Sequence, residues 1–156
     1  MKAMTQASAP SGTSRIQPGA RTYGCIRLEG VVGHGDARGR ELGYPTANIS
    51  VPDGEILDGV WAGTVRLGQG ENDEIYAAAV SVGQRPTYYH SGTRLLEAHL
   101  LEYDGDLYGR FVQVILHEYI RPQRRFGGTD ELAAQIRDDV ARVRCWFNGA
   151  GQELWT

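Results

Sequence analysis

Short segments rich in valine, isoleucine, leucine and tyrosine, separated by glycine-containing turns, run along the chain between residues 25 and 120. Several short strands at this spacing are typical of an antiparallel barrel or sandwich, so we predict a mainly β fold. The pattern predicts strands at residues 25–32, 60–67, 75–83, 95–103 and 110–120.

Two of the turns predict how strands connect. Residues 68–73 combine two glycines with asparagine and aspartate, and residues 104–106 read Asp-Gly-Asp. Turns of this composition favour β-hairpins. We therefore expect a hairpin across residues 68–73 and a second hairpin across residues 104–106.

One segment near the C-terminus has helical periodicity. Thr129 is a good N-cap residue, and the acidic Asp130 and Glu131 suit the positive end of a helix. Asn148-Gly149 supplies the stop. An apolar stripe at three- and four-residue steps predicts that this helix packs over the β structure. The stripe consists of Leu132, Ile136, Val140, Val143 and Phe147.

Length and composition restrict the function classes. The 156 residues suffice for one domain, and the first twenty are polar and small, so we predict a disordered tail at 1–20 and a single domain at 21–156. No apolar run approaches the roughly 20 residues of a membrane span. The net charge of −3 gives no basic footprint for nucleic acid. We expect a cytoplasmic monomer with two reduced cysteines that binds neither membrane nor nucleic acid.

A glycine-rich segment, residues 33–43, is a candidate phosphate site. Its glycines can bring backbone N–H groups around phosphate oxygens, and it contains arginines. Lys2, in the predicted tail, is the only lysine, so this is not a Walker A loop. A plain flexible loop is the alternative. The candidate ATP and phosphate residues are Gly33, Gly35, Arg38, Gly39, Gly43, Pro45, Thr46 and Asn48.

The sequence Pro45-Thr46-Ala47-Asn48 adds oxygen donors to this segment. Residues two apart in an extended segment face the same way, so the Thr46 hydroxyl and the Asn48 amide oxygen could join nucleotide phosphates around Mg²⁺. A turn in which Asn48 bonds to its own backbone is the alternative.

Glu97 is a candidate general base. Strand periodicity puts Glu97 and His99 on one face of the strand and Leu96, Ala98 and Leu100 on the other. A carboxylate in an otherwise apolar strand is unusual, because burying an unpaired charge is expensive. The alternative is a structural glutamate held by hydrogen bonds or an arginine.

The arginine-rich segment 121–126 lies just before the helix. Arg121, Arg124 and Phe126 could bind a nucleotide or hold a planar ring. A solvated loop is the alternative.

These segments, LGYPTAN, SVGQRPT, LEAHLL, DGDLYG and IRPQRRF, resemble the flavokinase family in their order. The family includes stand-alone riboflavin kinases and the C-terminal half of bifunctional bacterial FAD synthetases. The resemblance runs from residue 30 to about residue 147. It implies a six-stranded antiparallel Greek-key β-barrel with a C-terminal α-helix. The implied substrates are riboflavin and ATP, and the implied products are FMN and ADP.

The resemblance also implies residue roles. Thr46 and Asn48 would help to coordinate Mg²⁺, with Mn²⁺ or Zn²⁺ as substitutes, and residues 33–43 would cradle the ATP phosphates. Glu97 would be the catalytic base, and residues 121–126 would border the flavin. Gln123 stands where the family often has an acidic residue. No H-x-G-H signature of the adenylyltransferase domain occurs, so FMN is the expected end product.

Two rival functions fit parts of the sequence. A flavokinase-like paralogue would bind flavin or phosphorylate another substrate, but a pure binder has no need of Thr46, Asn48 and Glu97 together. A nucleic-acid-binding barrel of the OB type is the second rival. Net acidity and few aligned aromatic residues count against it.

Overall fold

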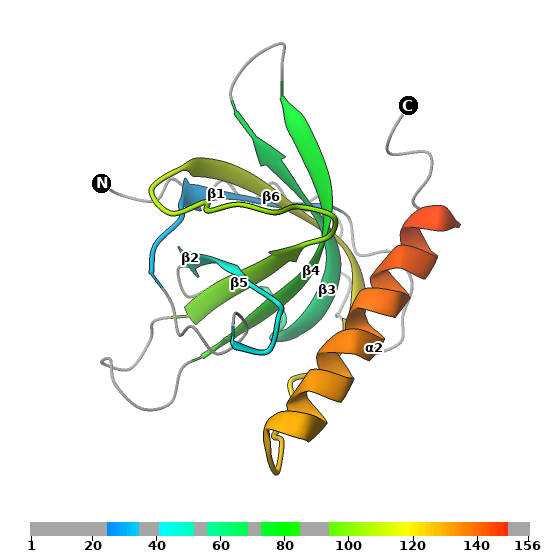
Figure 1. Cartoon of the computed structure of the whole chain (residues 1–156). Helices are drawn as coiled ribbons and strands as arrows, with labels where there is room; N and C mark the ends of the chain where they lie inside the picture. The colour runs from blue at the N-terminus through cyan, green and yellow to red at the C-terminus, as the bar shows by residue number, and fades with distance from the viewer. Residues whose placement is uncertain (1–24, 35–40, 52–55, 69–72, 85–93, 150–156) are drawn as a thin grey trace.

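The computed structural model describes residues 25–34, 41–51, 56–68, 73–84 and 94–149, so the predicted tail at 1–20 lies outside the described residues. Over these residues the chain forms an antiparallel barrel with one helix along its outside (Figure 1). The elements are β1 Ile26–Val31, β2 Ala47–Val51, β3 Gly59–Leu67, β4 Glu74–Gln84, β5 Arg94–Leu100, β6 Phe111–Arg121 and α2 Thr129–Asn148.

The strands form a single sheet in the order β1-β6-β3-β4-β5-β2, and neighbouring strands pair antiparallel. The sheet curls until its two edges meet just beyond β1, where the Gly33 N–H donates a hydrogen bond of 2.8 Å to the Asn48 carbonyl. The links from β2 to β3 and from β5 to β6 skip neighbouring strands, as a Greek key requires. The predicted six-stranded barrel with a C-terminal helix is confirmed.

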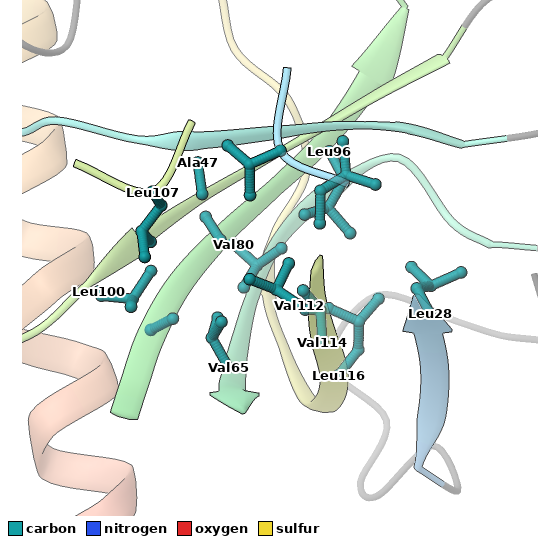
Figure 2. Packing of buried hydrophobic residues seen from close by; sticks show 14 of the residues in the cluster. Leu28, Ala47, Val65, Val80, Leu96, Leu100, Leu107, Val112, Val114 and Leu116 are labelled. Atoms are coloured by element: carbon teal, nitrogen blue, oxygen red, sulfur yellow. The ribbon is translucent and has the colours of Figure 1, made fainter. Parts of the chain in front are cut away.

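The barrel interior is filled by the inward-facing side chains of all six strands (Figure 2). On β5, Leu96, Ala98 and Leu100 are buried, whereas Leu95, Glu97 and His99 are half-buried on the outer face. The predicted alternation of this strand is confirmed. Burial of many aliphatic side chains supplies the main stabilisation of the barrel.

The C-terminal half of α2 covers the outer face of β3 and β4. Val143 and Phe147 form a second cluster with Ala62 and Leu101. The small Ala62 lets the helix approach the sheet closely. The N-terminal half of the predicted stripe has a different role, because Leu132 and Ile136 line a groove beside the sheet.

Three details of the sequence predictions are wrong. Residues 104–106 do not form a hairpin, because β6 pairs with β1 and β3 while β5 pairs with β4 and β2. Turn residues report local bending, but strand partners are decided by which apolar faces must close the barrel. The strand pattern also missed β2, a short strand that contains Asn48 and Ser50.

The third error concerns the start of the helix. The N-cap is the extended Gly128, without a side-chain cap, and Thr129 is already the first helical residue. The Glu131 carboxylate instead accepts a 2.7 Å hydrogen bond from the Gly127 N–H, which satisfies a donor near the helix start. The hairpin across residues 68–73 is confirmed, since β3 and β4 pair out to Leu67 and Glu74. Within the described residues, no helix has the length and hydrophobicity needed to cross a membrane.

Candidate active site

Five residues form a row across the outer face of the sheet. Asn48 on β2 is the register partner of Glu97 on β5, and Glu97 is also the partner of Ser81 on β4. Ser81 is opposite Val60 on β3, which is opposite Arg121 on β6. Directly opposed residues of antiparallel strands point to the same face with Cβ atoms about 4.5–5.5 Å apart. The barrel therefore brings the predicted metal ligand, base and arginine onto one line.

The middle of this row is the floor of a groove of about 750 Å³. Small residues of β4, Ala79, Ser81 and Gly83, alternate along the floor beside Leu95, Glu97 and His99 of β5. Residues 121–126, which we call the strap, and the first half of α2 form the walls. The small β4 side chains leave room for a flat ligand over the floor.

His99 holds the segment before β2 against the groove. Its Nδ1 lies 2.9 Å from the Pro45 carbonyl oxygen, and Tyr44 packs edge-on against its ring with centroids 5.4 Å apart. A carbonyl oxygen only accepts, so the Nδ1 atom of His99 carries the proton. This contact fixes Thr46, the next residue, beside the floor. The contact indicates a structural role for His99.

A smaller cavity of about 180 Å³ opens at the end of the barrel. Four predicted phosphate residues, Gly33, Pro45, Thr46 and Asn48, line it. Thr46 lines the groove as well, so this residue stands where the two recesses meet. Of the other predicted residues, Gly43 lines neither recess, and Gly35, Arg38 and Gly39 lie outside the described residues.

Asn48 has a buried oxygen that suits a cation. The residue is 6% exposed, and its Oδ1 atom has no hydrogen-bond partner among the described residues. Its amide nitrogen contacts the Thr46 carbonyl at 3.4 Å. An orphaned buried oxygen is costly, which favours a ligand in the functional state. No cluster of three acidic, histidine or cysteine side chains occurs in the described part of the chain. Mg²⁺ held by few protein oxygens together with substrate phosphates fits this donor set.

Sequence reasoning missed the aromatic pair at the mouth of the cavity. The rings of His34 and Tyr108 stack with centroids 3.7 Å apart, and both residues line the cavity. The Asp106 carboxylate accepts a 2.9 Å hydrogen bond from the Tyr108 N–H, which shapes the turn. The available signal was the motif DGDLYG, an acidic turn followed by an exposed aromatic residue.

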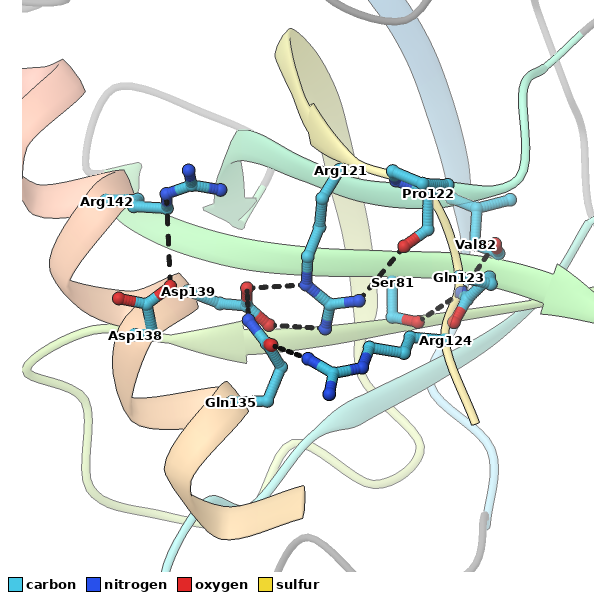
Figure 3. Close-up of polar contacts among 10 residues, drawn as sticks. All are labelled: Ser81, Val82, Arg121, Pro122, Gln123, Arg124, Gln135, Asp138, Asp139 and Arg142. Atoms are coloured by element: carbon cyan, nitrogen blue, oxygen red, sulfur yellow. Dashed lines mark hydrogen bonds and ion pairs between the residues drawn. The ribbon is translucent and has the colours of Figure 1, made fainter. Parts of the chain in front are cut away.

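Two strap arginines, Arg121 and Arg124, are already paired with carboxylates of α2, and Figure 3 shows the pair of Arg121 with Asp139. The Arg121 guanidinium makes two 2.7 Å hydrogen bonds to Asp139, which is 4% exposed. Arg124 donates 3.1 Å hydrogen bonds to Gln135 and to Glu131, both on α2. The strap is thereby fastened to the helix.

Phe126, the third predicted flavin residue, also lines the groove. The guanidinium carbons of Arg121 and Arg124 lie 6.0 and 5.6 Å from the centre of its ring. The structure thus brings Arg121, Arg124 and Phe126 together in the lining of the groove that also contains Glu97.

The fold is a small antiparallel barrel with two adjoining recesses, one lined by oxygen-bearing side chains and one with a carboxylate on its floor. The chain belongs to the flavokinase family, because the family model described as riboflavin kinase matches residues 23–147.

Relatives support this assignment. The bifunctional riboflavin kinase/FMN adenylyltransferase of Escherichia coli (strain K12) is 43% identical over 122 residues, which are 77% of this chain and 37% of that protein. The chain thus spans a little over a third of the length of this curated relative.

Two solved structures have a similar fold. The crystal structure of riboflavin kinase from Trypanosoma brucei has a TM-score of 0.55 and 26% identity, covering 84% of this chain and 83% of that one. A Streptococcus pneumoniae structure named a macrolide-efflux protein has a TM-score of 0.67 and 32% identity, covering 78% of this chain and 39% of that one. A shared fold does not carry over a function, so efflux is not assigned to this chain.

Proposed function

We propose that the chain is a riboflavin kinase that transfers the γ-phosphate of ATP to the ribityl 5′-hydroxyl of riboflavin, giving FMN and ADP. The observation that carries the proposal is the junction at Thr46, which lines both recesses. Asn48, which carries the orphaned oxygen, and Glu97, which carries the carboxylate, are register partners on neighbouring strands. A phosphate site and an acceptor-hydroxyl site must adjoin in this way for direct transfer.

The small cavity is assigned to the ATP phosphates. Gly33 and Pro45 would line the path of the phosphates, and Thr46 and Asn48 would hold Mg²⁺ on them. Mn²⁺ and Zn²⁺ remain proposed substitutes. The bound cation would neutralise charge on the transferring phosphoryl group. Among the described cavity residues there is no lysine or arginine, so a bound cation would supply positive charge there.

The large groove is assigned to riboflavin. Its described lining has three carboxylates, Asp58, Glu97 and Asp139, against three arginines, Arg121, Arg124 and Arg125. Equal numbers of opposite charges, with Arg121 and Arg124 already paired, suit an uncharged ring system better than an anion. Phe126 and the two arginines beside it would border the isoalloxazine ring.

Glu97 is assigned as the general base. It would accept the proton of the 5′-hydroxyl as that oxygen attacks the γ-phosphorus. The bond from the γ-phosphorus to the β–γ bridging oxygen breaks at the same time, and ADP leaves. Phosphoryl transfer needs mainly alignment of the reactants and charge neutralisation. One positioned base is therefore the only proton-transfer group that the protein has to supply.

Location and oligomeric state are part of the proposal. Both cysteines, Cys25 and Cys145, are free and exposed, which supports a reducing compartment such as the cytoplasm. One chain lines both recesses, which supports a monomer as the working unit.

The test is chromatographic separation of riboflavin, FMN and FAD after incubation with riboflavin, ATP and Mg²⁺. We expect FMN that requires both ATP and metal and is abolished by EDTA. A matched reaction with 5′-deoxyriboflavin should leave the flavin unchanged although it binds. Flavin binding without any FMN, with Mg²⁺, Mn²⁺ and Zn²⁺ each supplied, would contradict the kinase and favour a flavin binder.

A further inference from the structure

The strap, residues 121–126, has a second attachment, on the side away from α2. The Gln123 Nε2 atom donates a 2.8 Å hydrogen bond to the Ser81 hydroxyl oxygen and a 2.9 Å hydrogen bond to the Val82 carbonyl (Figure 3). We propose that Gln123 is a positioning residue for the flavin ligand, an inference that rests on the proposed function of the groove. It ties the strap to the floor on β4 and so sets the width of the groove.

Gly83 supports this inference independently. A Cβ atom added at Gly83 would lie 3.1 Å from the Gln123 Nε2 and 3.5 Å from its Cδ. The φ angle of Gly83 is outside the left-handed region, so backbone conformation does not require glycine there. The absent side chain instead makes room for the Gln123 amide on the floor. Both ends of the contact are therefore shaped for each other.

In this chain the contact uses the amide donors of Gln123, although the family often has an acidic residue at this position. Both partners accept from Nε2, and a carboxylate in the same place has no proton to donate to the Val82 carbonyl at neutral pH. The Ser81 oxygen accepts from Gln123, which leaves the Ser81 proton free to donate. Ser81 is the register partner of Glu97, so the attachment ends beside the proposed base.

The strap is consequently held between two elements. On one side Arg124 bonds to Gln135 and Glu131 of α2, and on the other Gln123 bonds to β4. Losing the β4 attachment frees the wall that carries Phe126 and leaves the small cavity untouched. The effect should therefore appear in flavin affinity and not in ATP affinity.

The decisive variant is Gln123→Glu, which keeps the side-chain length and removes both donors. We expect KM for riboflavin and the flavin Kd, measured by fluorescence quenching without ATP, to rise about tenfold, as the loss of one or two hydrogen bonds predicts. KM for ATP should stay within about twofold. Gly83→Ala should act in the same direction by crowding the amide. The matched control is Arg142→Ala, which removes only an exposed ion pair with Asp138 on α2.

A merely structural role would give a different pattern. If Gln123→Glu lowered the Tm and raised both KM values equally, or changed neither KM, the positioning role would be overturned. An unchanged flavin Kd in both Gln123→Glu and Gly83→Ala would also overturn it. A wild-type protein that binds riboflavin without making FMN would refute the kinase alone, since the Kd comparison still tests Gln123. A wild-type protein that binds no flavin would refute both.

Discussion

The two recesses that meet at Thr46 are built on opposite principles. The small cavity is lined mostly by apolar and uncharged polar residues, with Asp106 as its one described carboxylate, and it contains an orphaned buried acceptor, the Asn48 Oδ1. The large groove contains many charges, and two of its three arginines, Arg121 and Arg124, are paired with carboxylates of α2. In the cavity a buried oxygen lacks a hydrogen-bond partner in the free protein. In the groove the charges of Arg121 and Arg124 are already neutralised by carboxylates of the protein itself.

This difference explains how a single barrel could handle two unlike ligands. An anionic nucleotide with its cation needs unsatisfied oxygens and N–H groups, which cost stability in the free protein. A neutral ring needs a preformed slot, which internally paired charges keep rigid. Substitutions in the cavity should therefore reduce activity without reducing stability. Substitutions in the charge network of the groove should reduce stability as well.

The largest effect is expected at Glu97, the carboxylate between the two recesses. Glu97→Gln preserves shape and removes the base, so kcat for FMN formation should fall by about 10²–10⁴-fold. KM for riboflavin and for ATP should change little, because neither recess is reshaped. Steady-state kinetics measure this directly. A kcat equal to that of the wild type would exclude Glu97 as the base.

The next effect tests the internal pairing of the groove. Asp139→Asn leaves the largely buried Arg121 guanidinium, whose side chain is 15% exposed, without its charge partner. Breaking such a pair costs about 3 kcal/mol of unfolding free energy, measured by urea denaturation. The matched control is Glu131→Gln, which breaks the exposed pair with Arg124 and should cost less than about 1 kcal/mol. Equal costs for the two variants would show that the pairing is not structural.

The sequence predicted the groove floor better than its walls. On β5 the alternation is local, so Glu97 could be separated from Leu96 and Ala98 by periodicity alone. The wall depends on contacts between distant residues. Gln123 and Ser81 are 42 positions apart, and no local pattern links them.

The apolar stripe of the helix is a second case in which the local sequence pattern did not predict the contacts between distant residues. Periodicity identified its apolar face but not what covers it, and Leu132 and Ile136 line the groove while Val143 packs on the barrel. β2 was missed because five residues containing Asn48 and Ser50 carry little strand propensity. Closure of the barrel, a tertiary effect, makes that segment a strand.

A smaller effect is expected in the cavity, at Asn48. Asn48→Leu removes the orphaned oxygen while keeping the side-chain size. Activity should fall by at least roughly tenfold, with a higher Mg²⁺ requirement. The Tm should stay the same or rise, because the variant buries an apolar group where an unpartnered oxygen stood. A Tm loss comparable to that of Asp139→Asn would remove the contrast between the recesses.

The smallest effect lies outside both recesses, at His117 on β6. The residue is 7% exposed, its Nε2 lies 3.0 Å from the Thr64 hydroxyl, and its ring stacks on Trp146 of α2. The Cys25 thiol, 3.5 Å from Nδ1, is its only titratable contact among the described residues. Burial lowers the pKa of His117, because the charged imidazolium would lose its hydration.

The sign of the pH effect follows from this lowered pKa. In the unfolded chain His117 has a pKa of about 6.5, so it takes up a proton at a pH where the folded chain keeps it neutral. The free energy of unfolding that depends on neutral His117 is therefore fully present above about pH 6.5. It declines as the pH falls towards the lowered pKa of His117 in the folded state. Wild type should lose a few degrees more Tm between pH 7.5 and pH 5.5 than His117→Gln, which keeps a polar partner for Thr64 but cannot titrate. At pH 7.5 the variant should form FMN at the wild-type rate, because His117 lines neither recess. Identical pH profiles of Tm would contradict the role of His117, whereas a lost rate at pH 7.5 would show that the helix–barrel contact also shapes the groove.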